Sequence, residues 1–330
     1  MTAIVEVTDL AKVFDVSAPW LNRVIDRKPR LFVHAVDGVS FSIDKGKTLA
    51  LVGESGCGKS TVARLLVGLY KPTRGNVQFS GVDTKTLDAA QTRTLRRRMQ
   101  MIFQDPYASL NPRWKVLDIV AEPIREHGLV TDDGEQRAKV ADLLGSVGMA
   151  AADAEKFPHQ FSGGQRQRIS IARALATQPE FLVCDEPTSA LDVSVQAQVL
   201  NIMKDLQRQR GLTYLFISHN LAVVRHVSDQ VGVMYLGRLV ELADKADLFK
   251  RPRHPYTRML LDAIPDIHMT GRARTPVQGE VPNPLNPPTG CAFHPRCPHA
   301  NARCKSERPS LSAFQGIRVA CHAVEEGRIS

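Results

Sequence analysis

The sequence has 330 residues, a formal net charge of +9 and a hydrophobic content of 43%. This length and composition predict a globular protein with one large domain or two smaller ones. No apolar run approaches the roughly 18 residues of a membrane-spanning helix, and the first residues lack the features of a secretory signal. We therefore expect neither a membrane span nor a secretory signal.

The positive charge could indicate nucleic-acid binding, because phosphate backbones attract basic surfaces. However, residues 21–30 carry +3 and residues 251–330 carry +5, which leaves only +1 for the rest of the chain. This distribution argues against nucleic-acid binding, and we expect no nucleic-acid partner. The two basic segments could face acidic head groups or a partner protein, or simply form a solvated surface.

Residues 48–61, TLALVGESGCGKST, have the pattern of a phosphate-binding P-loop between a buried strand and a helix. In such a loop the backbone N–H groups surround the β-phosphate, Lys59 contacts the β- and γ-phosphates, and the Ser60 hydroxyl ligates Mg²⁺. The thiol of Cys57 is either a reactive thiolate, favoured by the helix start and Lys59, or an inert small side chain. The residues assigned to ATP binding here are Gly53, Glu54, Ser55, Gly56, Cys57, Gly58, Lys59, Ser60 and Thr61.

A second motif, PEFLVCDEPTSALD, places two carboxylates after four apolar residues, 181–184, that predict a buried strand. The carboxyl ends of strands are where open α/β sheets bind ligands. We expect Asp185 to hold Mg²⁺ through water and Glu186 to polarise the water that attacks the γ-phosphate.

Between these motifs, HQFSGGQRQRISIARAL predicts a helix that begins at a pair of glycines. Ser162 and the N–H groups at this helix start could bind an anion, although the hydroxyl of Ser162 could equally be a structural cap.

Together these motifs resemble the ATPase subunits of ATP-binding cassette (ABC) transporters, over roughly residues 3–265. The segment FSGGQ is similar to the family signature, with Phe161 in place of the commoner Leu, and SALD matches the family's D-loop. The resemblance implies that Gln104, in MIFQDP, is the Q-loop residue and a Mg²⁺ ligand, that His219 is the switch histidine, and that Phe14 stacks on adenine.

The family resemblance also implies an α/β P-loop NTPase fold with a RecA-like core, an antiparallel β subdomain and a helical subdomain at about residues 105–165. It further implies a head-to-tail dimer with a second ABC ATPase, because only one P-loop and one signature occur here. The signature residues would then act on the ATP of the partner cassette: Ser162, Gly163, Gly164 and Gln165.

After the cassette, RHPYTRMLLDAIP reads as a helix that begins at Pro255, with Met259, Leu260 and Ile264 on its apolar face. Residues 279–298 are too rich in Pro and Gly for regular structure. Both stretches resemble the C-terminal extension of oligopeptide- and dipeptide-type importers, so we expect a cassette at 1–265 and a small irregular extension at 266–330.

The importer resemblance implies two permease subunits, an extracytoplasmic binding protein, and a peripheral position at the cytoplasmic side of the inner membrane. Peptides are the expected cargo, with nickel, glutathione or antimicrobial peptides as alternatives. A soluble cassette ATPase of translation or DNA maintenance is the competing function. The insertion at residues 17–34, with Trp20 and several cations, could contact the membrane or the permease, or be a disordered loop.

Four cysteines lie near the C-terminus: Cys291, Cys297, Cys304 and Cys321. In an intracellular ATPase, stable disulfides are disfavoured. The spacing lacks the C-x2-C pairs usual for zinc, and four thiolates in a Pro-rich segment suit a 4Fe–4S cluster. The cysteines of the family's extension are similar. Zinc is the second alternative, because three histidines lie nearby, and four free thiols are the third.

Overall fold

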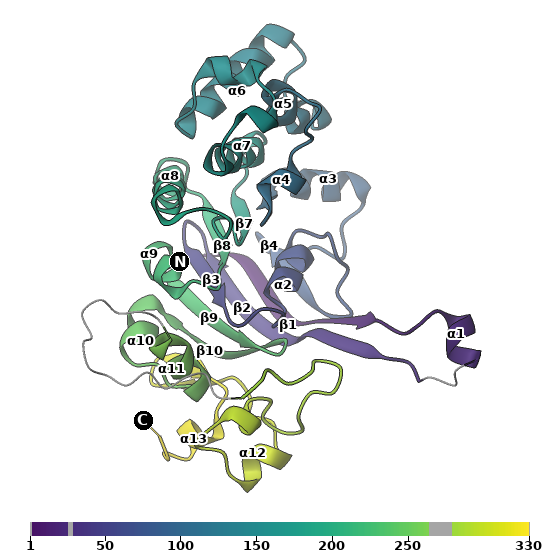
Figure 1. Ribbon diagram of the computed structural model, residues 1–330, viewed down its shortest axis with the longest axis vertical. Helices are drawn as coiled ribbons and strands as arrows, with labels where there is room; N and C mark the ends of the chain where they lie inside the picture. The colour runs from purple at the N-terminus through teal and green to yellow at the C-terminus, as the bar shows by residue number, and fades with distance from the viewer. Residues whose placement is uncertain (1, 26–28, 264–278, 330) are drawn as a thin grey trace. The chain divides into compact units, whose positions relative to one another are not determined.

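The structure, a computed structural model, describes residues 2–25, 29–263 and 279–329 (Figure 1). Its chain divides into two compact units. Unit 1 comprises Met1–Ile4, Ile43–Thr48 and Thr84–Ser218, and unit 2 comprises Val5–Ser42, Leu49–Asp83 and His219–Ser330. In the described residues, no helix is both long and apolar enough to cross a membrane.

Unit 1 contains three parallel strands, in the order β8, β7, β6, and a group of helices. Its elements are α3 (Ala89–Arg98), β6 (Met99–Ile102), α4 (Pro106–Ser109), α5 (Val116–Glu126), α6 (Asp133–Ser146), the 3-10 helices η1 (Ala151–Glu155) and η2 (Pro158–Gln160), α7 (Gly163–Leu175), β7 (Phe181–Asp185), α8 (Val193–Arg210) and β8 (Thr213–Ile217). Helices α5, α6 and α7 pack on one another (Figure 1), as expected for the helical subdomain.

Strand β7 is buried along its whole length, as the four apolar residues before Asp185 predict. It pairs in parallel with β6, and Ile102 lies opposite Cys184. Because parallel neighbours end at the same edge of a sheet, the residues that follow β6 and β7 emerge side by side. This register brings Gln104 to Glu186.

Unit 2 contains a sheet with the strand order β2, β1, β4, β5 and a run of strands with the order β3, β9, β10, β12, β11. Its elements are β1 (Ala3–Asp15), α1 (Trp20–Ile25), β2 (Phe32–Asp44), β3 (Thr48–Val52), α2 (Lys59–Leu66), β4 (Arg74–Phe79), β5 (Val82–Asp83), α9 (Leu221–Val227), β9 (Gln230–Tyr235), β10 (Arg238–Asp244), α10 (Lys245–Lys250), α11 (Pro255–Asp262), the 3-10 helix η3 (His294–Arg296), α12 (Ala302–Ser306), β11 (Ser312–Phe314), β12 (Ile317–Val319) and α13 (His322–Glu325). The antiparallel pairs β1–β4 and β4–β5 give the predicted antiparallel subdomain.

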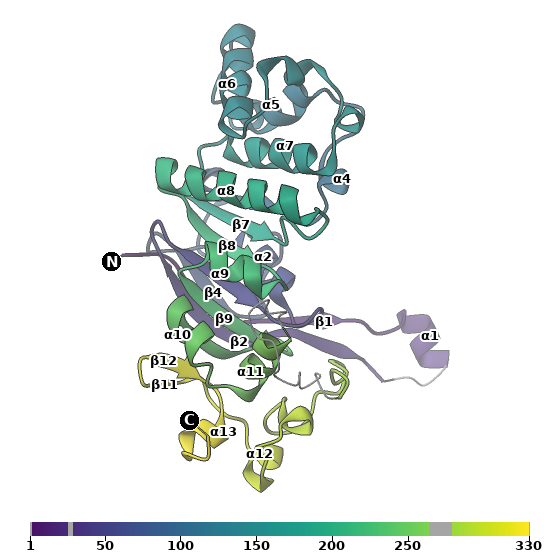
Figure 2. The same cartoon turned by 60° about the vertical axis from the view of Figure 1, so that its left-hand side comes forward.

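The insertion at residues 17–34 contains the short helix α1, and Figures 1 and 2 show it at the far end of β1 and β2. Residues 26–28, in the same insertion, lie outside the described residues. The side chains of Trp20 and Ile25 are exposed, at 70% and 71%. The described part of the insertion therefore presents apolar side chains to solvent.

The C-terminal segment joins the strands of unit 2 through β12, which pairs antiparallel with β10 and places Val319 opposite Glu241. Strand β11 completes the ladder as a hairpin with β12. Phe293, Ile317 and Val324 belong to the same buried apolar cluster as the residues of β9 and β10. The extension is thus packed as part of unit 2.

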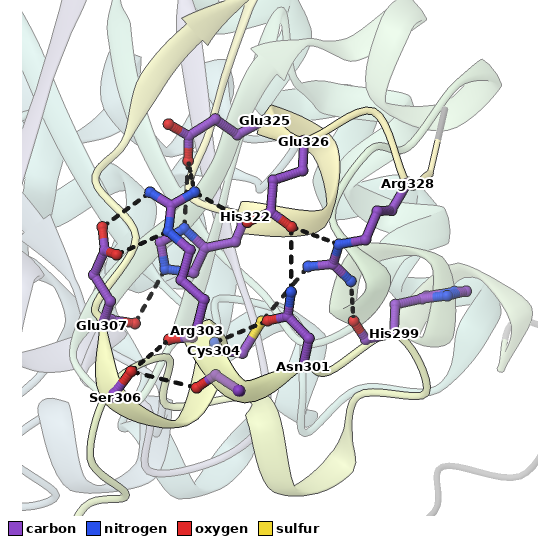
Figure 3. A network of polar contacts seen from close by, with 11 residues as sticks. His299, Asn301, Arg303, Cys304, Ser306, Glu307, His322, Glu325, Glu326 and Arg328 are labelled. Carbon is purple, nitrogen blue, oxygen red and sulfur yellow. Dashed lines mark hydrogen bonds and ion pairs between the residues drawn. The ribbon is translucent and has the colours of Figure 1, made fainter.

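A polar network organises the end of the extension (Figure 3). The guanidinium of Arg303 contacts the carboxylates of Glu307, at 2.8 and 2.9 Å, and of Glu326, at 3.0 Å. Arg328 contacts Glu326 at 2.6 Å and reaches the sulfur of Cys304 at 3.8 Å. These contacts connect α12 with the segment that follows β12.

Two features predicted for the C-terminal part of the chain are present in the structure. Helix α11 begins at Pro255, as predicted, and residues 279–298 contain no strand or α-helix. The boundary between residues 265 and 266 falls in 264–278, outside the described residues, as does Ile264. The division into a cassette at 1–265 and an extension at 266–330 stays a prediction.

Candidate functional site

The P-loop of unit 2 connects β3 to α2, as the sequence predicts. Gly53 and Gly58 have φ angles of +148° and +104°, which L side chains rarely adopt. A Cβ atom at Gly53 would lie 2.2 Å from the carbonyl oxygen of Met234, and one at Gly58 would lie 2.1 Å from that of Ala35. Glycine is therefore required at both positions by backbone conformation and by space.

Lys59 is the first residue of α2 and is only 4% exposed. Its ammonium donates hydrogen bonds to the carbonyl oxygens of Gly53, at 2.8 Å, and Glu54, at 3.0 Å. Ser60 and Thr61 follow at the start of the same helix and are half-buried. The charge of Lys59 is thus held within the loop, beside the N–H groups that could bind phosphate.

Cys57 lies in the same loop, and its thiol is 3.7 Å from the ammonium of Lys59. Burial raises the pKa of the Cys57 thiol, and this effect exceeds the opposing effect of Lys59. This direction favours the inert alternative over a reactive thiolate, because desolvation of the charged form outweighs the nearby cation.

Two further candidate residues of unit 2 lie outside the P-loop. Phe14 is half-buried near the end of β1, and its ring packs edge-to-face on that of Tyr70 at 5.4 Å. The ammonium of Lys12 lies 5.1 Å from the ring of Phe14. His219 is exposed just before α9, which is capped by Asn220.

The carboxylates of unit 1 lie at the end of β7, as predicted. Asp185 is 3% exposed and Glu186 is half-buried with a φ angle of +46°, an uncommon conformation for a non-glycine residue. The side-chain amide of Gln104 donates to Oε2 of Glu186 at 3.1 Å. The structure therefore brings together two of the three predicted catalytic side chains.

The signature segment forms the first turn of α7 in unit 1. Ser162 is the N-cap residue, its hydroxyl accepts from the N–H of Gln165, and the side chain of Gln165 accepts from the N–H of Ser162 at 3.0 Å. A Cβ atom at Gly164 would lie 2.2 Å from Cγ1 of Val195 in α8. The capping function of Ser162 is thus present, and Gly164 is required by close packing.

The candidate ATP-site residues are divided between the two units. The P-loop, Phe14 and His219 belong to unit 2, whereas Gln104, Asp185, Glu186 and the signature belong to unit 1. Hydroxyl and carboxylate oxygens are the ligands that Mg²⁺ prefers, so Ser60 and Asp185 fit this ion chemically.

The four C-terminal cysteines all belong to unit 2 and have free thiols. Burial, with smaller contributions from the neighbouring cysteines, raises the pKa of Cys291 and of Cys297 to about 11. Among the described residues, however, no group of three or more His, Cys, Asp or Glu side chains could hold a metal ion. The 4Fe–4S cluster and its zinc alternative have no support from this geometry.

The sequence did not reveal that Glu54 forms hydrogen bonds with Arg296 of the extension and with Tyr256. Its carboxylate contacts the guanidinium of Arg296 at 2.8 and 2.9 Å, and its N–H donates to the hydroxyl of Tyr256 at 2.9 Å. The partners are 242 and 202 residues away in the chain, so no local pattern could have indicated these contacts.

Comparison with known proteins agrees with this fold and site. Residues 36–189 match the model of the ABC transporter family, and residues 240–304 match that of the oligopeptide/dipeptide transporter C-terminal region. The chain is 54% identical over 295 residues to the di/tripeptide transport ATP-binding protein DppF of Pseudomonas aeruginosa, covering 89% of this chain and 91% of that protein. It is 50% identical to the oligopeptide transport ATP-binding protein AppF of Bacillus subtilis, covering 97% of both.

The chain belongs to the ABC transporter ATPase family. Among solved structures, the dimeric ATP-binding cassette MJ0796 bound to ADP and Pi is similar, with a TM-score of 0.64, 26% identity, and coverage of 73% of this chain and 98% of that one. The predicted family and fold class are thereby confirmed. This ABC ATPase is an ATP-hydrolysing transport subunit, and ATP and Mg²⁺ are typical of the family.

Proposed function

We propose that this ABC ATPase powers the import of di- or oligopeptides through a partner permease. The observation that carries the proposal is the match of residues 240–304 to the oligopeptide/dipeptide transporter C-terminal region, joined to a complete set of cassette motifs. Relatives that match most of the chain are named for di/tripeptide and oligopeptide transport. These names favour peptides over nickel or glutathione, and an importer over a soluble ATPase of translation or DNA maintenance.

The test is transport by the reconstituted complex. The chain is co-expressed with its permease subunits and a second ATPase, placed in proteoliposomes, and supplied with the binding protein and peptides. Peptide-stimulated ATP hydrolysis and peptide uptake are expected, and both should vanish with Lys59→Ala. Stimulation only by nickel or glutathione would replace the peptide cargo, and failure to co-purify with any membrane protein would remove the importer function.

In the proposed ATP site, each side chain acts as its position and charge allow. Lys59 and the N–H groups of the P-loop bind the phosphates, and Phe14 stacks on adenine. Ser60, Gln104 and, through water, Asp185 would hold Mg²⁺, which would supply positive charge to the phosphates when bound. Glu186 accepts a proton from the attacking water, and the amide of Gln104, 3.1 Å away, orients this carboxylate. His219, the switch histidine, is the third side chain that we assign to catalysis, beside Glu186 and Gln104.

We further propose that the chain pairs head-to-tail with a second ABC ATPase, a paralogue in the simplest case. The capped first turn of α7 then presents its glycines and Ser162 to the ATP of the partner cassette. Each ATP would lie between the P-loop of one chain and the signature of the other. Two permease subunits and an extracytoplasmic binding protein complete the assembly.

The proposed location is the cytoplasmic side of the inner membrane, with peripheral membrane contact. Helix α1 supports this placement, because Trp20 and Ile25 are exposed and Arg23 lies in the same short helix. An aromatic ring, an aliphatic side chain and a cation on one short segment suit a membrane interface with acidic head groups. Loss of vesicle binding in Trp20→Ala would support this contact.

We keep the 4Fe–4S cluster as a proposal for the four cysteines, with zinc second. Its support is the donor chemistry alone, since the four cysteines of unit 2 have free thiols, the side chains that hold such clusters. Protein purified without oxygen should be brown, with about four iron and four sulfide per chain, and Cys297→Ser should bleach it. One zinc per colourless chain would favour the alternative, and metal-free protein of undiminished stability would leave only free thiols.

A further inference from the structure

Glu54, the second residue of the P-loop, is held by residues far from it in the chain. Its carboxylate accepts two hydrogen bonds from the guanidinium of Arg296, at 2.8 and 2.9 Å. The side chain of Arg296 is only 2% exposed, and that of Glu54 is 22% exposed. This bidentate contact between planar groups fixes orientation as well as distance, which a surface pair of flexible side chains would not do.

Aromatic rings surround the guanidinium of Arg296. It lies 5.8 Å from the ring centre of Tyr235 and 5.9 Å from that of Phe293. Tyr256 packs against both rings, at 4.7 and 5.4 Å, and its hydroxyl accepts the N–H of Glu54. The backbone N–H of Glu54 is therefore bound by Tyr256 of this aromatic group, and its carboxylate is bound by the guanidinium that two of the rings flank.

The opposite end of the P-loop contacts the same residue. The ammonium of Lys59 donates to the carbonyl oxygen of Glu54 at 3.0 Å. Glu54 thus connects the phosphate-binding lysine with Arg296. A shift of Glu54 changes the direction of loop N–H groups and the position of the Lys59 ammonium, on which phosphate binding depends.

Charge gives the pair a second role. A carboxylate in the P-loop would repel the phosphates of ATP if it were not neutralised. Arg296 supplies the neutralising charge from a buried position, where screening by water is weak. The guanidinium of an Arg stays protonated in proteins, so this charge persists at every physiological pH.

Arg296 also lies within the cysteine-bearing segment of the extension. It ends η3, directly before Cys297, and its N–H donates to the carbonyl oxygen of Phe293 at 3.0 Å. The N–H of Cys291 donates to the carbonyl oxygen of Cys304 at 2.8 Å, which closes the surrounding loop. The conformation of this segment therefore determines where the guanidinium lies.

We propose that Arg296 is a positioning residue of the ATP site: it holds and neutralises Glu54, and so makes ATP binding by the P-loop depend on the C-terminal extension. This inference rests on the proposed role of the P-loop in binding ATP. It gives the extension a task in the ATPase reaction that is separate from any metal bound by its cysteines.

The test measures ATP affinity of the full chain and KM and kcat of the reconstituted complex. Arg296→Ala should raise the Kd and KM for ATP about tenfold, within the usual range of coupling between sites, with a smaller change in kcat. Arg296→Lys should recover part of the affinity, because one charge remains but the bidentate contact is lost. The double variant Arg296→Ala/Glu54→Gln should bind ATP more tightly than Arg296→Ala, since it leaves no unpaired carboxylate.

Arg251→Ala is the matched control, because it removes an exposed Arg that pairs with Asp247 at 2.9 Å. Its KM should equal that of the unmodified protein. If Arg296→Ala lowers the melting temperature but leaves KM and Kd unchanged, the pair is only structural and the proposal is overturned. The proposal would also be overturned if the double variant lost as much ATP affinity as Arg296→Ala and Glu54→Gln lose in sum. Lys59→Ala distinguishes failure of the Arg296 proposal from failure of the proposed P-loop function. If this variant still bound ATP, the P-loop would not be the ATP-binding site.

Discussion

Glu186→Gln separates the catalytic role of this carboxylate from its structural contacts. Gln is nearly isosteric with Glu and tolerates the same φ angle of +46°. The hydrogen bond of 3.1 Å from the amide of Gln104 persists, because the side-chain oxygen of a Gln also accepts. The N–H of Glu186, which donates to the carbonyl oxygen of Ile217 at 3.0 Å, is unaffected. The variant therefore retains the local geometry and loses only the proton acceptor.

The magnitude follows from that loss. A positioned general base contributes about 10²–10⁴-fold to a rate, so kcat should fall by about three orders of magnitude, or about 4 kcal/mol in the barrier. The Kd for ATP should change less than about threefold, because the P-loop is untouched and the net charge near the phosphates becomes less negative. The assay is phosphate release by the reconstituted complex, with ATP binding measured on the same preparation.

Glu135→Gln serves as the control, because this exposed carboxylate lies in the first turn of α6, far along the chain from the catalytic motifs. It should retain full activity. ATPase activity of Glu186→Gln within tenfold of the unmodified complex would refute the assignment of Glu186 as the base. A parallel fall in ATP affinity would also refute it, since the substitution would then act through binding.

Three further outcomes are expected. Gly164→Ala should destabilise the protein by about 1–3 kcal/mol through overpacking and reduce ATPase activity of the complex; Val195→Ala in the same chain should restore both, and no recovery would contradict the close contact. Maleimide should label Cys57 slowly at pH 7 and faster as pH rises, because burial raises its pKa; rapid labelling at pH 7, absent in Cys57→Ser, would contradict this. Burial lowers the pKa of His254 to about 3, so between about pH 6.5 and pH 3 the folded state binds fewer protons than the unfolded state. The free energy of unfolding, measured by urea titration, should therefore decrease as the pH is lowered through this range, by up to about 1.4 kcal/mol per pH unit. His254→Asn, which can still cap α11, should flatten this slope.

The main chemical motifs could be predicted from sequence because each is local. The P-loop needs glycines at positions of positive φ, a lysine at the helix start, and an apolar strand before them, and all of these lie within residues 48–61. The same holds for β7 with Asp185 and for the cap of α7 at Ser162, since strand burial and helix capping involve residues only a few positions apart. The helix start at Pro255 follows from the same local preference.

Sequence reasoning left alternatives open where neighbours distant in the chain decide the outcome. For Cys57 the local pattern left both a reactive thiolate and an inert side chain open, and burial, which raises the pKa of the thiol, favours the inert side chain. The exposure of a side chain depends on which segments pack around it. That packing is not encoded in any short window of residues.

The sequence by itself determined the family, the order of the nucleotide motifs and the residue types that bind phosphate, because these depend on spacing and backbone conformation within short segments. Only the tertiary structure decided that β12 adds to β10, that Gln104 reaches Glu186, and that Arg296 holds Glu54. Each of these contacts joins residues between about 80 and 240 positions apart, and their formation depends on strand pairing and on burial of the intervening apolar surface. The physical reason is that charge neutralisation and hydrogen bonding act through space, so the partners of a side chain are set by the packed fold.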